Sequence, residues 1–199
     1  MAYVRLSPDD RRAQLLALAV RTFTERPYDD FSMDDLAAEA GVSKGLLYHY
    51  FPSKRALYLE VLHGAASELL GLMRPQPGLP LPDQLRAALL AYLAYVRERA
   101  PAYRAILRGG VGTDPEVAAV AELVRRTIRE RILEGLQIPL PSPRLRLTVS
   151  GWVGLVEAAS LDWLDHDDLD SERLADLLVD ALTALLGALR QASSRGSNP

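Results

Sequence analysis

The sequence predicts an all-α fold, and three observations support this class. Apolar residues recur at spacings of three and four through most of the 199 residues, as they do along one face of a helix. Serine, aspartate and proline precede these stretches and glycine or proline follows them, which is how helices begin and end. Nowhere do apolar and polar side chains alternate as in a half-buried strand. We therefore expect a chain built from helices.

The helices are expected in the following order. The first begins at Ser7-Pro8, a helix cap followed by proline at the first helical position, and ends before Pro27. Two short helices follow in 32–40 and 43–51. The proline-rich stretch 74–82 is the clearest break in the chain. The longer helices are expected near 53–73, 83–100, 101–108, 114–136, 143–165 and 171–190.

The two short helices and the turn between them carry the most informative pattern. Residues 31–51 read FSMDDLAAEAGVSKGLLYHYF. Ser32 is a suitable N-cap, and Asp35 is the acidic partner of a capping box. Gly41 stands where the first short helix must reverse, and Ser43 caps the second. This spacing is typical of a helix-turn-helix that reads DNA.

The second short helix has two distinct faces. Leu47 and Phe51 are four residues apart and share an inner, apolar face. The outer surface carries Lys44, Gly45, Tyr48, His49 and Tyr50. A helical hairpin with a merely solvated outer face is the alternative, but the cap, the turn glycine and both faces agree on a DNA-reading element.

The stretch 41–57 resembles the tetracycline-repressor (TetR) family of bacterial transcription regulators. In that family a G-V-S-x-G-x-x-Y-x-(H/Y)-F-x-x-K-x-x-L string spans the recognition helix and the start of the next helix. Nine positions are in register: Gly41, Val42, Ser43, Gly45, Tyr48, Tyr50, Phe51, Lys54 and Leu57. The resemblance implies nine helices, with a three-helix DNA-binding head over 1–53 and a six-helix effector-binding and dimerisation body over 54–191. We expect a disordered tail over 192–199.

The resemblance also implies which residues meet double-stranded DNA. Leu46 and His49 are expected to face base edges. The residues expected to contact the DNA backbone are Ser32, Ser43, Lys44, Gly45, Tyr48 and Lys54. Two residues depart from the family pattern. Met33 stands where many relatives carry a phosphate-binding threonine, and Asp34 puts a negative charge where arginine is frequent.

The charge balance limits how DNA can be bound. The net charge is −3, and residues 1–55 hold eight Lys or Arg and eight Asp or Glu. Affinity must therefore come from the placement of a few cations, with weak non-specific binding and a modest salt dependence. The cations considered are Arg5, Arg11, Arg12, Lys44, Lys54 and Arg55.

The last two helices carry a wide apolar stripe, and we expect part of it to form a homodimer interface. The residues considered are Val153, Val156, Leu178, Leu182 and Leu185. Burial of the same stripe inside one chain is the alternative. The two-fold symmetry of such a dimer matches a palindromic operator.

The expected effector pocket draws on residues spread over the body. Aromatic side chains with polar tips suit a largely apolar pocket with a few orienting hydrogen bonds. The residues considered are His63, Met73, Tyr92, Tyr95, Tyr103, Trp152 and Glu157. For the aromatic residues, the alternative is that they are ordinary members of the hydrophobic core. Glu157 is open to two interpretations, as a ligand anchor or as a pair partner across the dimer.

Several functions are disfavoured by what the chain contains. It has no cysteine and only three histidines, and the glycines of 109–112 follow a helix rather than a strand, unlike a nucleotide-binding loop. The acidic cluster 162–170 has the residue types of a cation site, but such loop acids usually cap the next helix, here through Asp170 or Ser171. We expect no enzyme activity, metal or cofactor.

The sequence, together with its resemblance to the TetR family, therefore predicts a dimeric transcriptional regulator. The resemblance implies a repressor that a small effector releases from its operator, and we expect that effector to be largely apolar. A helical dimeric adaptor that does not bind DNA is the alternative, but it leaves the register of 41–57 unexplained. With no signal-peptide core and no run long enough to span a bilayer, a cytoplasmic protein is expected.

Overall fold

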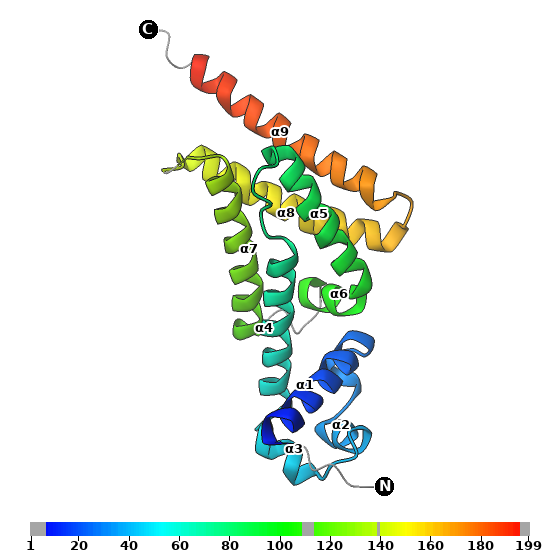
Figure 1. The fold of residues 1–199 in the computed structure, drawn as a ribbon. Helices are drawn as coiled ribbons and strands as arrows, with labels where there is room; N and C mark the ends of the chain where they lie inside the picture. The colour runs from blue at the N-terminus through cyan, green and yellow to red at the C-terminus, as the bar shows by residue number, and fades with distance from the viewer. Residues whose placement is uncertain (1–6, 109–113, 139, 196–199) are drawn as a thin grey trace. The chain divides into compact units, whose positions relative to one another are not determined.

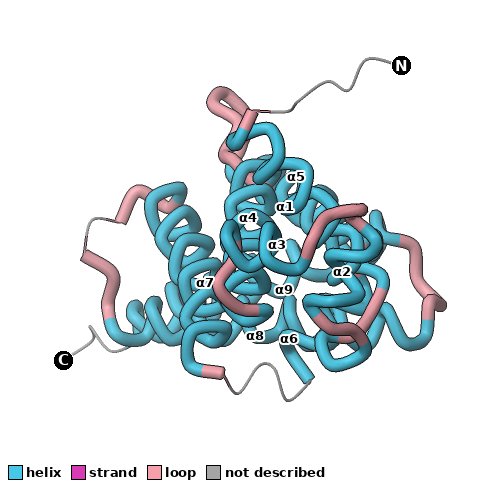
Figure 2. The backbone as a smooth tube through the Cα atoms, turned by 90° about the horizontal axis from the view of Figure 1, so that it is seen from below, coloured by secondary structure: helices cyan, strands magenta, loops and turns pink. Residues whose placement is uncertain are grey.

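The all-α prediction is confirmed. A computed structural model of the chain describes residues 7–108, 114–138 and 140–195. These residues form nine α-helices and a 3-10 turn at Tyr28–Asp30, with no strand among them (Figure 1, Figure 2). The helices are α1 (Pro8–Glu25), α2 (Met33–Glu39), α3 (Lys44–Tyr50), α4 (Lys54–Leu72), α5 (Leu81–Glu98), α6 (Ala100–Arg108), α7 (Pro115–Gly135), α8 (Pro143–His166) and α9 (Ser171–Arg195).

The helix boundaries follow the expected ones closely, except at the C-terminal end. Helix α9 continues to Arg195, so that four residues of the expected tail, 192–195, are helical. The rest of that tail, the glycines of 109–112 and Pro139 lie outside the described residues. None of the described helices is long and apolar enough to cross a bilayer.

Serine caps explain where three of the helices begin. The hydroxyl oxygens of Ser7, Ser43 and Ser142 accept hydrogen bonds from backbone N–H groups in the first turns of α1, α3 and α8, at 3.1, 3.2 and 3.2 Å. Each bond satisfies a donor that the helix itself leaves without a partner. Proline follows directly in α1 and α8, where its fixed φ suits the first helical position.

The helices form two compact units that are not contiguous in sequence. The first unit comprises 1–67 and 99–121, and the second comprises 68–98 and 122–199. Helices α4 and α7 therefore contribute to both units. The functional ranges 1–53 and 54–191 stay a prediction, since a compact unit need not coincide with a functional part of the chain.

The first unit is built around an aromatic cluster. The ring of Phe23 lies 4.9 Å from the rings of Phe31 and Tyr58, and Tyr58 lies 4.9 Å from Tyr28, between ring centres. Burial raises the pKa of Tyr58 to about 12 because the phenolate would lose its hydration. Met33 is buried in the same unit. The apolar residue at this position therefore belongs to the core.

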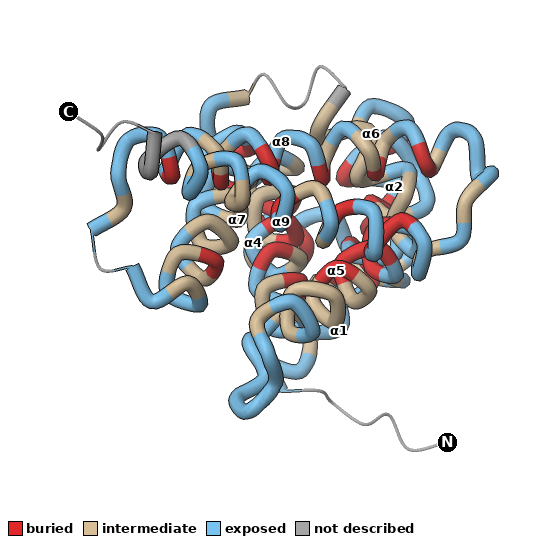
Figure 3. Tube along the Cα trace, turned by 90° about the horizontal axis from the view of Figure 1, so that it is seen from above, coloured by how far each residue is buried: buried red, intermediate tan, exposed pale blue. Residues whose placement is uncertain are grey.

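The second unit packs α5, α8 and α9 against one another. Leu93, Val149 and Leu178 are among its buried side chains, all at 1% exposure or less. Figure 3 colours the buried positions of the chain red. The indole Nε1 of Trp152 donates a hydrogen bond to the carbonyl oxygen of Leu178 at 2.8 Å. This bond ties α8 to α9 and satisfies the polar edge of a buried ring.

Four of the five residues expected at a dimer interface are covered within one chain, and their place in an interface stays a prediction. Val153, Val156, Leu178 and Leu182 are at most 7% exposed within one chain, so their side chains are already covered. The stripe was correctly identified as apolar, but periodicity does not tell which neighbour covers it. Leu185, at 41% exposure, remains at the surface.

Candidate nucleic-acid interface

Reciprocal hydrogen bonds hold the start of α2, as the sequence predicted. The backbone N–H of Asp35 donates to Ser32 Oγ at 3.2 Å, and the backbone N–H of Ser32 donates to Asp35 Oδ2 at 2.8 Å. The Ser32 hydroxyl donates to the same carboxylate oxygen at 2.7 Å, and these bonds lower the pKa of Asp35. The Ser32 proton is therefore directed to Asp35, rather than to the expected phosphate.

The turn between α2 and α3 is closed by backbone hydrogen bonds. The N–H of Gly41 donates to the carbonyl of Ala38 at 3.1 Å, and the N–H of Val42 donates to that of Ala37 at 3.0 Å. Gly41 has a φ of 65°, a left-handed conformation that is costly for any residue with a Cβ. The glycine therefore sets the angle at which α3 leaves the turn.

Helix α3 has the two faces that the sequence predicted. Leu47 is fully buried, and the capping residue Phe51 is 1% exposed. The residues at the surface are Lys44, Gly45, Tyr48 and His49, with Leu46 half-buried beside them. A Cβ placed on Gly45 would meet no heavy atom within 4 Å. This face is open to a ligand, and the opposite face of α3 is anchored in the core by Leu47 and Phe51.

Lys54 has a different environment from the one expected of a phosphate-binding residue. Its ammonium donates hydrogen bonds to the carbonyl oxygens of Tyr28 and Phe31. It lies 4.4 Å from the centres of both rings, a cation–π arrangement. Burial lowers the pKa of Lys54 because the charged form loses water. We therefore correct its role: Lys54 ties the segment before α2 to the start of α4.

Lys44 is paired with the acidic residue that departs from the family pattern. Its ammonium donates a hydrogen bond to Asp34 Oδ2 at 2.8 Å, and this bond raises the pKa of Lys44. The same ammonium lies 5.8 Å from the centre of the Tyr48 ring. The first turn of α2 and the exposed side of α3 thus form one surface.

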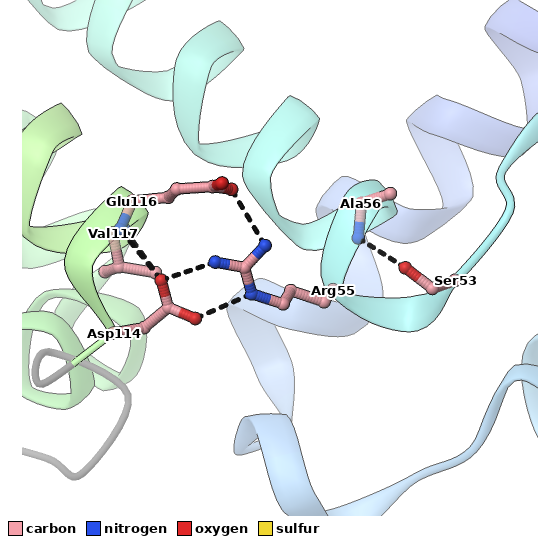
Figure 4. A network of polar contacts seen from close by, with 6 residues as sticks. All are labelled: Ser53, Arg55, Ala56, Asp114, Glu116 and Val117. Carbon is pink, nitrogen blue, oxygen red and sulfur yellow. Dashed lines mark hydrogen bonds and ion pairs between the residues drawn. The ribbon is translucent and has the colours of Figure 1, made fainter.

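Arg55, another of the expected DNA-binding cations, is engaged in a polar network (Figure 4). Its guanidinium donates to both carboxylate oxygens of Asp114 at 2.7 and 2.9 Å and to Glu116 Oε2 at 2.8 Å. Asp114 also accepts a hydrogen bond from the backbone N–H of Glu116 at the start of α7. These donors lower the pKa of Asp114 to about 2. Arg55 therefore links α4 to α7.

The other expected cations also have protein partners where they are described. Arg12 donates to Glu60 Oε2 at 2.6 Å and lies 5.1 Å from the centre of the Phe51 ring. Arg11 donates to Gln14 Oε1 at 2.8 Å. Arg5 lies outside the described residues. Arg11 and Gln14 are 3 residues apart in the sequence, whereas Arg12 and Glu60 are 48 apart. No local sequence pattern predicts the second pair.

The residues considered for an effector pocket are divided between the two units. His63 and Tyr103 belong to the first, and His63 is exposed. The second contains half-buried Met73 and the buried side chains of Tyr92, Tyr95 and Trp152. Glu157 accepts a hydrogen bond from Arg125 Nε at 2.8 Å, a pairing within the chain that neither interpretation of this residue foresaw. The pocket itself stays a prediction.

The acidic loop caps a helix, as its residue types suggested. Asp170 Oδ1 accepts a hydrogen bond from the backbone N–H of Arg173 at 2.8 Å in the first turn of α9. Asp167 accepts one from Arg97 at 2.6 Å. Among the residues that the structure places, no group of three or more potential ligands has the geometry of a metal site.

Comparison with known families agrees with the geometry of α2 and α3. A family model described as "Bacterial regulatory proteins, tetR family" matches residues 15–61, which include both helices. A second model, described as "Tetracyclin repressor-like, C-terminal domain", matches residues 81–185. The two matches together span most of the described helices.

Individual relatives point the same way. The chain is 32% identical over 167 residues to the HTH-type transcriptional activator FasR of Mycolicibacterium smegmatis, covering 82% of this chain and 76% of FasR. It is 48% identical over 58 residues to the HTH-type transcriptional regulator EthR of Mycobacterium tuberculosis, covering 29% of this chain and 27% of EthR. The solved structure of a TetR-family regulator from Streptomyces coelicolor matches with a TM-score of 0.86 at 33% identity, covering 92% of this chain and 83% of that one. These relatives are transcription regulators and not enzymes, and the chain therefore belongs to the TetR family of DNA-binding transcriptional regulators.

Proposed function

We propose that this regulator is a homodimer that binds a palindromic operator with the α3 helix of each subunit. The exposed face of α3 carries this proposal, because a polar surface stands on a helix whose opposite face is anchored by Leu47. His49 offers a ring nitrogen to a purine acceptor, and half-buried Leu46 offers a methyl group to thymine. Tyr48 and the backbone at Gly45 supply the phosphate contacts that position the helix.

The dimer is proposed to form through the exposed face of α8 and α9. Four leucines on these helices are 41 to 62% exposed: Leu147, Leu155, Leu177 and Leu185. Gly151 and Gly154 have open space where a Cβ would stand, which allows close approach of another helix. Apolar surface of this kind favours burial against a second copy. Light scattering on the purified protein tests the dimer, and a monomer at micromolar concentration would exclude it.

We further propose that a small, largely apolar effector binds within 54–191 and shifts the protein towards a state with low DNA affinity. The buried aromatic side chains of the second unit support an apolar ligand.

We propose repression by occupation of the promoter, in the cytoplasm where bacterial DNA lies. Because the relative FasR is named an activator, the direction of regulation must be measured. A promoter reporter is compared in cells with and without the gene that encodes this protein. An increase in reporter output caused by the protein would contradict repression.

The binding proposal is tested by selecting duplexes from a random-sequence pool and measuring affinity by fluorescence anisotropy. His49→Ala is expected to weaken binding to the selected duplex about tenfold, the effect of losing one good base contact. The matched control is His63→Ala, since His63 is an exposed histidine on α4. Failure of the wild-type protein to enrich any duplex contradicts the function. Equal affinities for wild type and His49→Ala contradict the site.

A further inference from the structure

We propose that Asp34 limits the affinity of α2 and α3 for DNA of any sequence by neutralising Lys44, and thereby makes binding depend on base contacts. This inference rests on the DNA binding proposed above. It assigns to Asp34 a role in setting the sequence-independent affinity through the lysine it holds, without itself contacting a base.

The geometry joins the two side chains directly. Asp34 Oδ2 and Lys44 Nζ are 2.8 Å apart, on α2 and α3 respectively. The side chains are 58% and 61% exposed, so the pair lies on the surface that faces solvent. The adjacent acid, Asp35, is used by the capping box with Ser32. Asp34 is thus directed to α3, while its neighbour stabilises the start of α2.

The position of Lys44 in the sequence makes this pairing consequential. Lys44 is the only Lys or Arg between residues 27 and 53, a stretch that also contains Asp29, Asp30, Asp34, Asp35 and Glu39. The nearest cations beyond it, Lys54 and Arg55, are engaged with backbone carbonyls and with Asp114 and Glu116. Pairing Lys44 with Asp34 therefore offsets the one formal positive charge that the helix-turn-helix carries.

The consequence for DNA binding follows from how affinity depends on charge. Each lysine that neutralises a phosphate releases counterions, and this gain is independent of sequence. A phosphate must compete with Asp34 for Lys44, and the Asp34 carboxylate also repels the phosphate. An exposed ion pair is weak enough to be broken at an operator, where base contacts add to the attraction. The pair thus lowers the sequence-independent part of the affinity, so that a larger share of the binding free energy must come from base contacts.

The decisive experiment compares Asp34→Asn with Glu39→Gln on sheared mixed-sequence DNA between 50 and 200 mM salt. Both substitutions remove one negative charge from α2, and Glu39 is exposed on the same helix. Asp34→Asn is expected to bind more tightly and to have a log–log salt slope steeper by about 0.9 per subunit, or about a threefold larger loss of affinity per subunit over this range. Glu39→Gln is expected to keep the wild-type slope, and Asp34→Glu, which retains the charge, is expected to behave as wild type.

A double-mutant cycle identifies the partner. Lys44→Gln is expected to have little effect on mixed-sequence binding alone, but to remove the gain of Asp34→Asn when the two are combined. Circular dichroism melting confirms that each variant is folded. If Asp34→Asn and Glu39→Gln have equal slopes while the wild-type protein binds a selected duplex, the role of Asp34 is wrong and DNA binding stands. If wild type and variants bind neither the selected nor the mixed-sequence duplexes, the proposed function fails and this inference with it.

Discussion

The two units of the chain are stabilised in different ways. In the first, α2 and α3 have seven residues each, too few for a helix to persist without help. Serine caps and a capping box hold the starts of these helices, and the Lys54 ammonium holds the segment before α2. In the second, α8 and α9 have 24 and 25 residues and bury a continuous apolar stripe. The DNA-reading part therefore depends on particular polar groups, whereas the second unit depends on apolar area that many sequences could provide.

The largest expected effect tests the dependence of the second unit on its core. Leu178→Ala should lower the free energy of unfolding by about 3 kcal/mol, because Leu178 is 1% exposed and its removal leaves a cavity. Leu72→Ala, at a position that is 53% exposed on α4, is the control and should change it by less than about 0.5 kcal/mol. Urea denaturation followed by circular dichroism measures both. Similar values for the two variants would show that the stripe does not carry the stability.

The next effect separates the two lysines of the helix-turn-helix region. Lys54→Met should lower the free energy of unfolding by about 1 to 2 kcal/mol, because the carbonyls of Tyr28 and Phe31 lose a charged donor that is half-buried. Lys44→Met should leave unfolding nearly unchanged, since Lys44 is exposed. Urea denaturation provides the measurement. If Lys54→Met is as stable as the wild type but binds DNA more weakly, Lys54 contacts a phosphate after all and the role given to it here is wrong.

A smaller effect compares a helix cap in each unit. Ser32→Ala removes the capping box of a seven-residue helix and should cost about 1 kcal/mol. Ser142→Ala removes a single cap bond from a 24-residue helix and serves as the matched variant. Hydrogen exchange should show faster exchange along the whole of α2 in the first variant, but only in the first turn of α8 in the second. Equal, localised effects would mean that α2 does not depend on its cap.

The smallest effect concerns acid. The pKa of Asp114 is about 2 in the folded chain, below its ordinary value of 3.8, so the folded state binds fewer protons than the unfolded state between these values. The stabilisation is therefore complete above about pH 4 and is lost as the pH falls towards 2. Asp114→Asn should remove this part of the pH dependence. Denaturation midpoints measured at pH 5 and pH 3 for both proteins check the sign, and parallel curves would refute it.

Local signals predicted the helices well. The capping box of Ser32 and Asp35, the left-handed Gly41 and the buried Leu47 depend on residues no more than a few positions apart, and the structure contains all three. The Arg55–Asp114 bonds join residues 59 apart, and no periodicity or capping rule specifies such a pair. Lys54 was assigned to phosphate from the family pattern, because the pattern records that lysine recurs at this position but not which atoms it binds.

The apolar stripe shows the same limit. Helical spacing identified Val153, Val156, Leu178 and Leu182 as apolar positions, but it did not show that neighbouring helices of the same chain cover them. Residues that alternate with them around α8 and α9, among them Leu155 and Leu177, are the ones left at the surface. Which side of an apolar helix is covered depends on the packing of distant segments.

The sequence was sufficient for whatever depends on neighbouring residues: the helix class, the caps, the turn and the two faces of α3. Those features follow from hydrogen bonds and side-chain positions within a few turns. Tertiary structure was needed to identify the partner of each charged side chain. It placed Asp34 against Lys44, Arg55 against Asp114 and Glu157 against Arg125, because ion pairs form between side chains that folding brings within hydrogen-bond distance. The partner of a charged residue is therefore a property of the fold.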